Sequence, residues 1–159
     1  MMIDRINLRD YKIGDLKFYF EFQRDRTANY TAAFTLKNPD SWTEFRDHWD
    51  RILNDDEIIV KSITFNEKVI GNILSFVLDN EREVSYWIDK NYWGRGVATN
   101  ALKTFLLEYK LRPLYARTAF DNIGSIRVLE KCGFVKIGEG KYFANARNKE
   151  IVEDIFLLK

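Results

Sequence analysis

The segment from Tyr92 to Thr99, which reads Tyr-Trp-Gly-Arg-Gly-Val-Ala-Thr, decides how the rest of this chain is interpreted. It follows a predicted strand that ends near Ile88 and opens a predicted helix. A helix N-terminus carries unpaired N–H groups and a partial positive charge, which together bind phosphate. Gly94 and Gly96 let the backbone turn and leave no Cβ in a phosphate's way, and Arg95 adds a cation. The segment therefore predicts a phosphate-binding turn, although paired glycines before a helix also occur in purely structural turns.

Strand and helix patterns lie on both sides of this segment. Three β-branched runs precede it, and a strand–helix–strand–helix–strand order includes and follows it. The predicted strands are the Ile-Asn-Leu-Arg stretch near the N-terminus, Ile58–Phe65, Val69–Val77, Arg82–Ile88, Leu114–Thr118, Phe134–Ile137 and Asp154–Leu158. The predicted helices are Leu16–Arg26 after Asp15, one opened by the N-cap Ser41, Gly96–Leu111 before Pro113, and one from the Asp121-Asn122 cap to Cys132, ended by Gly133. This order predicts an α+β or mixed α/β fold with a central, mostly antiparallel sheet and flanking helices.

Composition limits the classes of protein that fit. The 159 residues suit one compact domain, and the chain has no repeat or Pro/Gly-rich linker. With 25 basic and 24 acidic residues the net charge is +1, which argues against a nucleic-acid partner. No apolar run is long enough for a membrane span, and the first residues, Met1 to Arg5, lack the apolar core of a signal peptide. A single cysteine and no Cys/His cluster predict no internal disulfide and no metal site. The expected location is the cytoplasm.

Two sequence blocks resemble the GNAT (Gcn5-related) N-acetyltransferases. Trp-Gly-Arg-Gly-Val-Ala is similar to the coenzyme A pyrophosphate loop of that family, with Trp93 at the usual Gln/Arg position, as in the RimJ/RimL-type subgroup that acetylates ribosomal-protein N-termini. Asn100 stands where that subgroup usually has Glu. The second block, Asn122 to Phe134, is similar to the family's Asn-x-x-Ala/Ser…Glu-Lys-x-Gly-Phe segment. The resemblance covers about a third of the chain and does not extend to residues 1–57.

The resemblance implies a GNAT-like domain with a splayed pair of parallel strands that holds acetyl-CoA as co-substrate. It implies direct attack of a primary amine on the thioester in a ternary complex, without an acyl-enzyme. Residues 1–57 would then form the substrate side, and residues 58–159 the acetyl-CoA-binding core. The residues expected to contact the cofactor are Trp87, Ile88, Trp93, Gly94, Arg95, Gly96, Val97, Ala98, Thr99, Asn122 and Ser125.

Two residues are candidates for catalysis. Glu83 lies near the position where related enzymes place a catalytic glutamate, and strand alternation puts it on one face with Ser85 and Trp87. A carboxylate in an aromatic cleft has a raised pKa, which suits a base acting through water. The alternative interpretation of Glu83 is a solvated carboxylate at the end of a strand, without a catalytic role. Ser125 matches the subgroup's serine that is proposed to assist the leaving thiolate, because Leu129 stands where many relatives have a tyrosine. Asn122 is both a helix cap and a candidate cofactor contact.

Other residues are weaker candidates. Cys132 is interpreted as a buried apolar residue rather than a nucleophile, and His48, the single histidine, as non-catalytic. Glu150, Glu153 and Asp154 on the last predicted hairpin are interpreted as solvated edge carboxylates, with a second carboxylate near the acceptor as the alternative.

Three alternatives to the acetyltransferase hypothesis stay open: a non-catalytic coenzyme A-binding regulator, a transferase for another acyl group, and a nucleotide-binding module that uses only the glycine turn. The acceptor is a protein N-terminus, an amino acid, a polyamine or an antibiotic amine, and the protein is a monomer or a homodimer.

Overall fold

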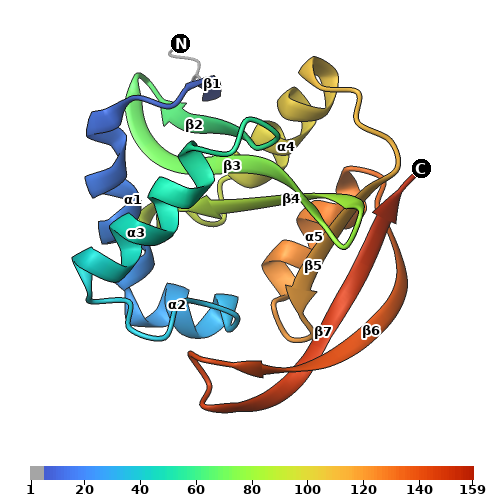
Figure 1. Cartoon of the computed structure of the whole chain (residues 1–159). Helices are drawn as coiled ribbons and strands as arrows, with labels where there is room; N and C mark the ends of the chain where they lie inside the picture. The colour runs from blue at the N-terminus through green and yellow to red at the C-terminus, as the bar shows by residue number, and fades with distance from the viewer. Residues whose placement is uncertain (1–5) are drawn as a thin grey trace.

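The computed structural model describes residues 6–159, and its centre is a seven-stranded sheet in the order β1-β2-β3-β4-β5-β7-β6 (Figure 1). The expectation drawn from Met1 to Arg5 concerns residues outside that range. The strands are β1 (Ile6–Asp10), β2 (Ile59–Phe65), β3 (Lys68–Leu78), β4 (Glu81–Ile88), β5 (Leu114–Ala119), β6 (Val135–Ala144) and β7 (Lys149–Leu158). All neighbouring strands are antiparallel except β4 and β5. The predicted mixed fold with one parallel pair is confirmed.

Helices cover both faces of this sheet. They are α1 (Leu16–Arg24), α2 (Arg26–Ala32), α3 (Trp42–Leu53), α4 (Val97–Glu108) and α5 (Ile123–Lys131), with short 3-10 turns at Ile13–Asp15 and Lys90–Tyr92. The faces of β3 alternate, so that Ile73 packs with α4 while Leu74 packs with α1 and α3. None of the helices in residues 6–159 is long and apolar enough to cross a membrane.

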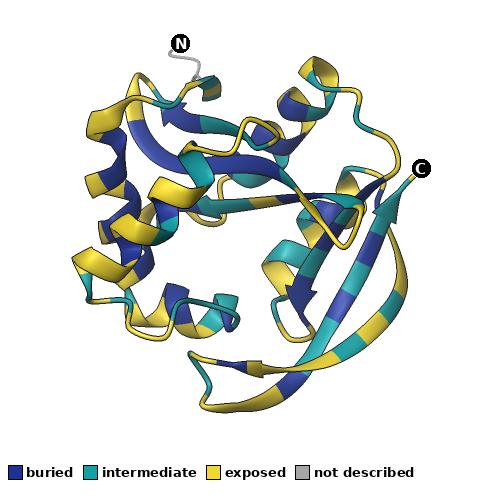
Figure 2. Ribbon diagram, viewed as in Figure 1, coloured by how far each residue is buried: buried dark blue, intermediate teal, exposed yellow. Residues whose placement is uncertain are grey.

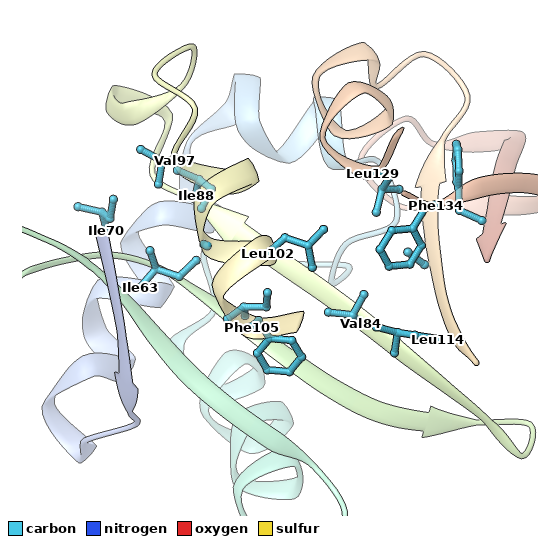
Figure 3. Packing of buried hydrophobic residues seen from close by; sticks show 14 residues of the cluster. Ile63, Ile70, Val84, Ile88, Val97, Leu102, Phe105, Leu114, Leu129 and Phe134 are labelled. Atoms are coloured by element: carbon cyan, nitrogen blue, oxygen red, sulfur yellow. The ribbon is translucent and has the colours of Figure 1, made fainter. Parts of the chain in front are cut away.

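The main core lies between the sheet and the α4–α5 layer. Figure 3 shows Leu102 and Phe105 of α4 pointing toward Val84 of β4, and Leu129 of α5 close to Phe134. These apolar side chains are almost fully buried. Burial at about 25 cal/mol per Å² of apolar surface makes this packing the main stabilising contribution to the position of α4. The core therefore fixes α4 and α5 relative to β4.

The parallel strands β4 and β5 separate almost at once. They share the single register pair Glu83↔Tyr115, whereas β3 and β4 stay paired from Gly71↔Ile88 to Leu78↔Glu81. Beyond Glu83 and Tyr115, toward their carboxyl ends, the two strands form no further ladder pairs with each other. In open sheets of this kind, ligands bind outside the carboxyl ends of strands at such a separation.

The β6–β7 hairpin tip is bound to the loop after α2. Ala146 donates its N–H to the carbonyl of Ala33 at 3.1 Å, and the Asn145 amide donates to the carbonyl of Thr35 at 2.7 Å. Arg147 donates to the carbonyl of Tyr30 at 2.7 Å, lies 4.0 Å over its ring, and forms a two-pronged ion pair with Asp121 at 2.9 and 3.0 Å. The β6–β7 hairpin tip thus holds α2 and the loop after it in place.

Several boundaries differ from the sequence expectation. The predicted helix 16–26 is two helices, because Asp25 is extended and its carboxylate caps α2 by accepting the Ala28 N–H at 2.9 Å. Asp15 does not cap α1, because its carboxylate is bonded to Arg9, Ser62 and the Lys12 amide. The predicted Ser41 cap is confirmed.

Elements near the C-terminal half also differ in length. The helix of α4 ends at Glu108 rather than Leu111, because Tyr109 is extended and its ring packs on Phe105. The strands β6 and β7 are longer than predicted. Figure 2 shows that β6 is mostly exposed or half-buried, so it carries little of the apolar alternation that marks a strand.

Candidate functional site

A groove of about 480 Å³ lies where α2, β4, the glycine turn, α4 and α5 meet, and it is called the central groove below. All the predicted contact residues except Arg95 line it, namely Trp87, Ile88, Trp93, Gly94, Gly96, Val97, Ala98, Thr99, Asn122 and Ser125. Ala28, Thr31 and Ala32 of α2 form part of its wall, which sequence patterns did not indicate. The two blocks recognised in the sequence, and a segment of the N-terminal third, therefore border one cavity.

The turn before α4 presents unpaired backbone amides. Gly94 and Gly96 have φ of +76° and +74°, in the left-handed region that favours glycine. The first bond of the helix runs from Asn100 N–H to the carbonyl of Gly96 at 3.0 Å, so the amides of Val97 to Thr99 have no partner within it. A Cβ on Gly96 would meet no atom of residues 6–159 within 4 Å, its chain neighbours aside. This open, positively polarised end of α4 suits a phosphate group.

Trp93 attaches the turn to the end of β4. Its indole Nε1 donates to the carbonyl of Ile88 at 3.0 Å. Asp89, the next residue, accepts the N–H of Asn91 at 3.1 Å and starts the short turn that leads to Trp93. Trp93, at the family's Gln/Arg position, thus binds the backbone at the end of β4 through its side chain. Arg95 lies outside the groove lining, with its guanidinium 5.2 Å from the centre of the Tyr92 ring.

The first turn of α5 brings Ser125 into the groove. The Asn122 side chain caps α5 by accepting the Ser125 N–H at 3.2 Å, and Asn122 lines the groove as well. The Ser125 hydroxyl lies 3.0 Å from the hydroxyl of Tyr86 on β4. Burial raises the pKa of Tyr86 to about 12. Tyr86 has no local sequence signal, since only the spatial neighbourhood of β4 and α5 distinguishes this tyrosine from the others.

Glu83 lies on the opposite face of β4 from Tyr86, as strand alternation requires. It is 3% exposed and accepts a hydrogen bond from Arg117 Nε of β5 at 3.0 Å. Burial raises the pKa of Glu83, and Arg117 opposes part of that rise. Arg117 Nη1 also lies 3.6 Å from Glu153 of β7, whose pKa burial raises. Glu83 is therefore a buried, ion-paired carboxyl beside the separating strands, and it does not line the central groove.

Trp87 lines the central groove from the same strand as Glu83. Its indole N–H is buried and has no hydrogen-bond partner in the part of the chain that the structure describes. An unpaired buried donor of this kind is costly in a folded protein.

The discounted residues have clear structural surroundings. Burial raises the pKa of Cys132, which keeps its thiol protonated, and its sulfur lies 3.8 Å from the Thr99 carbonyl. His48 is on α3, away from the groove lining, and burial lowers its pKa. Asp154 is buried and pairs with Lys136 at 3.2 Å, while Glu150 is exposed.

Comparisons with known proteins agree with this arrangement. A family model described as "Acetyltransferase (GNAT) domain" matches residues 5–135. A Bacillus subtilis (strain 168) protein named "Probable N-acetyltransferase YjcK" is 39% identical over 59 residues, which are 35% of this chain and 33% of that protein. The chain thus matches about a third of the length of that curated relative.

Solved structures share the fold across almost the whole chain. The microcin C7 self-immunity acetyltransferase MccE, in complex with acetyl-CoA and AMP, has a TM-score of 0.80 at 16% identity, covering 96% of this chain and 91% of that one. The spermidine N-acetyltransferase from Vibrio cholerae, in complex with CoA and spermine, has a TM-score of 0.76 at 20% identity, covering 96% and 95%. Since the family model spans well over half of the residues, the chain belongs to the GNAT acetyltransferase family.

Proposed function

We propose that this protein transfers the acetyl group of acetyl-CoA to a primary amine. The observation that carries the proposal is the central groove, which joins the amides of Val97 to Thr99, left without partners by the first turn of α4, to the carboxyl end of β4. A pyrophosphate at the amides would direct the rest of the cofactor along β4, past Trp87 and toward Ser125. Both acetyl-CoA and CoA occupy solved structures of this fold.

In the proposed reaction, the neutral amine attacks the thioester carbonyl, forming the new C–N bond. The negative charge that develops on the carbonyl oxygen would be stabilised by a backbone N–H of β4, which lacks a ladder partner on the β5 side beyond Glu83. The nitrogen then loses one proton to water, and when the intermediate collapses the C–S bond breaks and the sulfur keeps the electron pair. Ser125 is the proposed hydrogen-bond donor to this thiolate, since its hydroxyl lies in the groove wall.

Glu83 is the proposed general base, acting through water. A primary ammonium has a pKa of about 8 at a protein N-terminus and about 10.4 on lysine, so a proton must leave before attack. The raised pKa of Glu83 brings its proton affinity closer to that of the amine, and this supports the proposal. Its ion pair with Arg117 argues for transfer through an intervening water, because one carboxylate oxygen is already engaged.

The proposed acceptor is a primary amine, with a protein N-terminus as the first candidate because of the RimJ/RimL-type loop. Small-molecule amines are the alternative, and the Vibrio cholerae spermidine N-acetyltransferase is a protein of this fold solved with spermine. A direct assay with both kinds of amine distinguishes a protein N-terminus from a small-molecule acceptor.

The test is a panel of amines incubated with the purified protein and acetyl-CoA, with release of free CoA thiol as the readout. The panel contains peptides with free N-termini, polyamines, amino acids and aminoglycosides. Turnover above the hydrolysis background with any member supports the proposal, and its rank order identifies the acceptor class. Binding of acetyl-CoA by calorimetry without turnover on any amine would favour the non-catalytic coenzyme A-binding regulator instead.

A further inference from the structure

The wall of the central groove contains a tyrosine that the proposed reaction has not used. Tyr86 is on β4 and its side chain lines the groove beside Ser125. Leu129 of α5, at the position where the family's leaving-group tyrosine is expected, is 1% exposed and packed in the main core. The Leu129 side chain has no polar atom and cannot donate a hydrogen bond to the leaving sulfur. The phenol nearest to Ser125 thus comes from the neighbouring strand.

Packing and hydrogen bonds hold this pair in a fixed geometry. The Tyr86 ring packs against the main core, and its hydroxyl lies 3.0 Å from Ser125 Oγ and 3.5 Å from the Ser125 carbonyl. The Ser125 backbone is fixed by the Asn122 cap at 3.2 Å. Neither hydroxyl can therefore turn away without breaking a contact.

The relative acidity of the two hydroxyls sets the direction of the bond between them. The Tyr86 hydroxyl has one proton and two acceptors in reach, and Ser125 Oγ at 3.0 Å is closer than the Ser125 carbonyl at 3.5 Å. A phenol is also a stronger acid than an aliphatic alcohol, so the favoured arrangement has Tyr86 donating to Ser125 Oγ. Burial raises the pKa of Tyr86 to about 12, so its proton is present throughout the working pH range. A serine hydroxyl has one proton, and here that proton is left free to face the groove.

We propose that Tyr86 is a positioning residue that aims the Ser125 hydroxyl at the departing sulfur. The inference rests on the proposed acetyl transfer. As the C–S bond breaks and its electron pair passes to sulfur, Ser125 donates a hydrogen bond to the thiolate while Tyr86 donates one to Ser125. No proton leaves either residue, and the thiolate takes its proton from water after release. The bond from Tyr86 polarises the serine and so strengthens its donation.

The experiment is a double-mutant cycle with Tyr86→Phe, Ser125→Ala and the double variant. The assay uses acetyl-CoA and an amine that the parent protein acetylates. Tyr86→Phe should lower kcat about tenfold, the size of one lost hydrogen bond, and leave the KM and Kd for acetyl-CoA unchanged. In the Ser125→Ala background, Tyr86→Phe should have no further effect, because its partner is gone.

Tyr115→Phe is the matched control, since it also removes one phenol hydroxyl. Tyr115 is on the neighbouring strand β5 and does not line the groove. It should keep the kcat of the parent. Thermal unfolding of each variant, with and without acetyl-CoA, separates a loss of fold from a loss of rate.

The outcomes separate the two proposals. Suppose that the parent acetylates an amine but Tyr86→Phe keeps the parent's kcat, or that the losses of kcat from the two substitutions multiply in the double variant. In either case Tyr86 does not act through Ser125, so this inference is wrong while the proposed function stands. A rise in KM with constant kcat would likewise overturn it, because it would assign Tyr86 to cofactor binding. If the parent acetylates no amine, the proposed function itself fails, and the inference with it.

Discussion

Replacing Gly96 by alanine separates the strain of the glycine turn from its use as a phosphate site. Gly96 has φ of +74°, and an alanine there costs about 1–2 kcal/mol of stability because its Cβ crowds the following carbonyl. Among the described residues the new methyl would meet no atom within 4 Å, and Gly96 lines the groove, so we expect the methyl to take up space that the phosphate would use. A phosphate kept away from one amide loses a charge-assisted hydrogen bond of about 1.5–3 kcal/mol, or roughly 10- to 150-fold in affinity.

Gly133→Ala is the control for this prediction. Gly133 also has a positive φ, +91°, but its Cβ would make only an ordinary contact with Leu158 at 3.4 Å, and Gly133 does not line the groove. Both variants should lower the melting temperature by about 2–4 °C per kcal/mol of strain. Only Gly96→Ala should weaken acetyl-CoA binding in calorimetry. Equal affinities for the two folded variants would refute the assignment of the turn as the pyrophosphate site.

Three further outcomes follow from contacts described above. Trp93→Phe removes the bond to the Ile88 carbonyl, so KM for acetyl-CoA should rise about 2- to 10-fold at constant kcat; a fall in kcat alone would contradict this. Glu83→Gln should lower kcat/KM by up to about 10²–10⁴-fold near pH 7 and recover partly toward pH 10, where the amine is already neutral; a pH profile parallel to the parent would make Glu83 structural. Arg147 lowers the pKa of Asp121, so this pair adds stability above the unfolded carboxyl pKa of about 3.9, and the added stability is lost as pH falls through the folded value. Arg147→Ala should therefore lower the melting temperature more at pH 7 than at pH 3, and an equal loss at both would exclude the ion pair as the cause.

Local signals made the glycine turn predictable from the sequence. The positive φ of Gly94, Gly96 and Gly133 and the caps at Ser41 and Asn122 each depend on residues a few positions apart. Such signals hold where no tertiary contact competes for the capping side chain, as Arg9 and Ser62 compete for Asp15. The same reasoning located α4, α5 and the strands that frame the groove.

Contacts between distant residues were not predictable in this way. Tyr86 meets Ser125 across 39 positions, and Glu83 meets Arg117 across 34. Both pairs depend on where β5 and α5 lie beside β4, and the register of two strands joined by one residue pair has no local sequence signal. Asp25 shows a related difficulty, because a capping aspartate inside an apolar helical pattern looks the same as a surface residue.

The placement of β7 between β5 and β6 has a consequence for the order in which the fold assembles. β5 is held to β4 by one register pair but to β7 along its whole length, from Leu114↔Leu158 to Ala119↔Glu153. A folding intermediate in which β7 has not yet paired therefore has β5 without most of its ladder hydrogen bonds. The loop after α2 also lacks the hairpin tip that binds it. The phosphate turn depends on contacts between nearby residues, whereas the pairing of β7 joins residues about 40 positions apart, so we expect the α2 wall of the groove to settle only after β7 has docked.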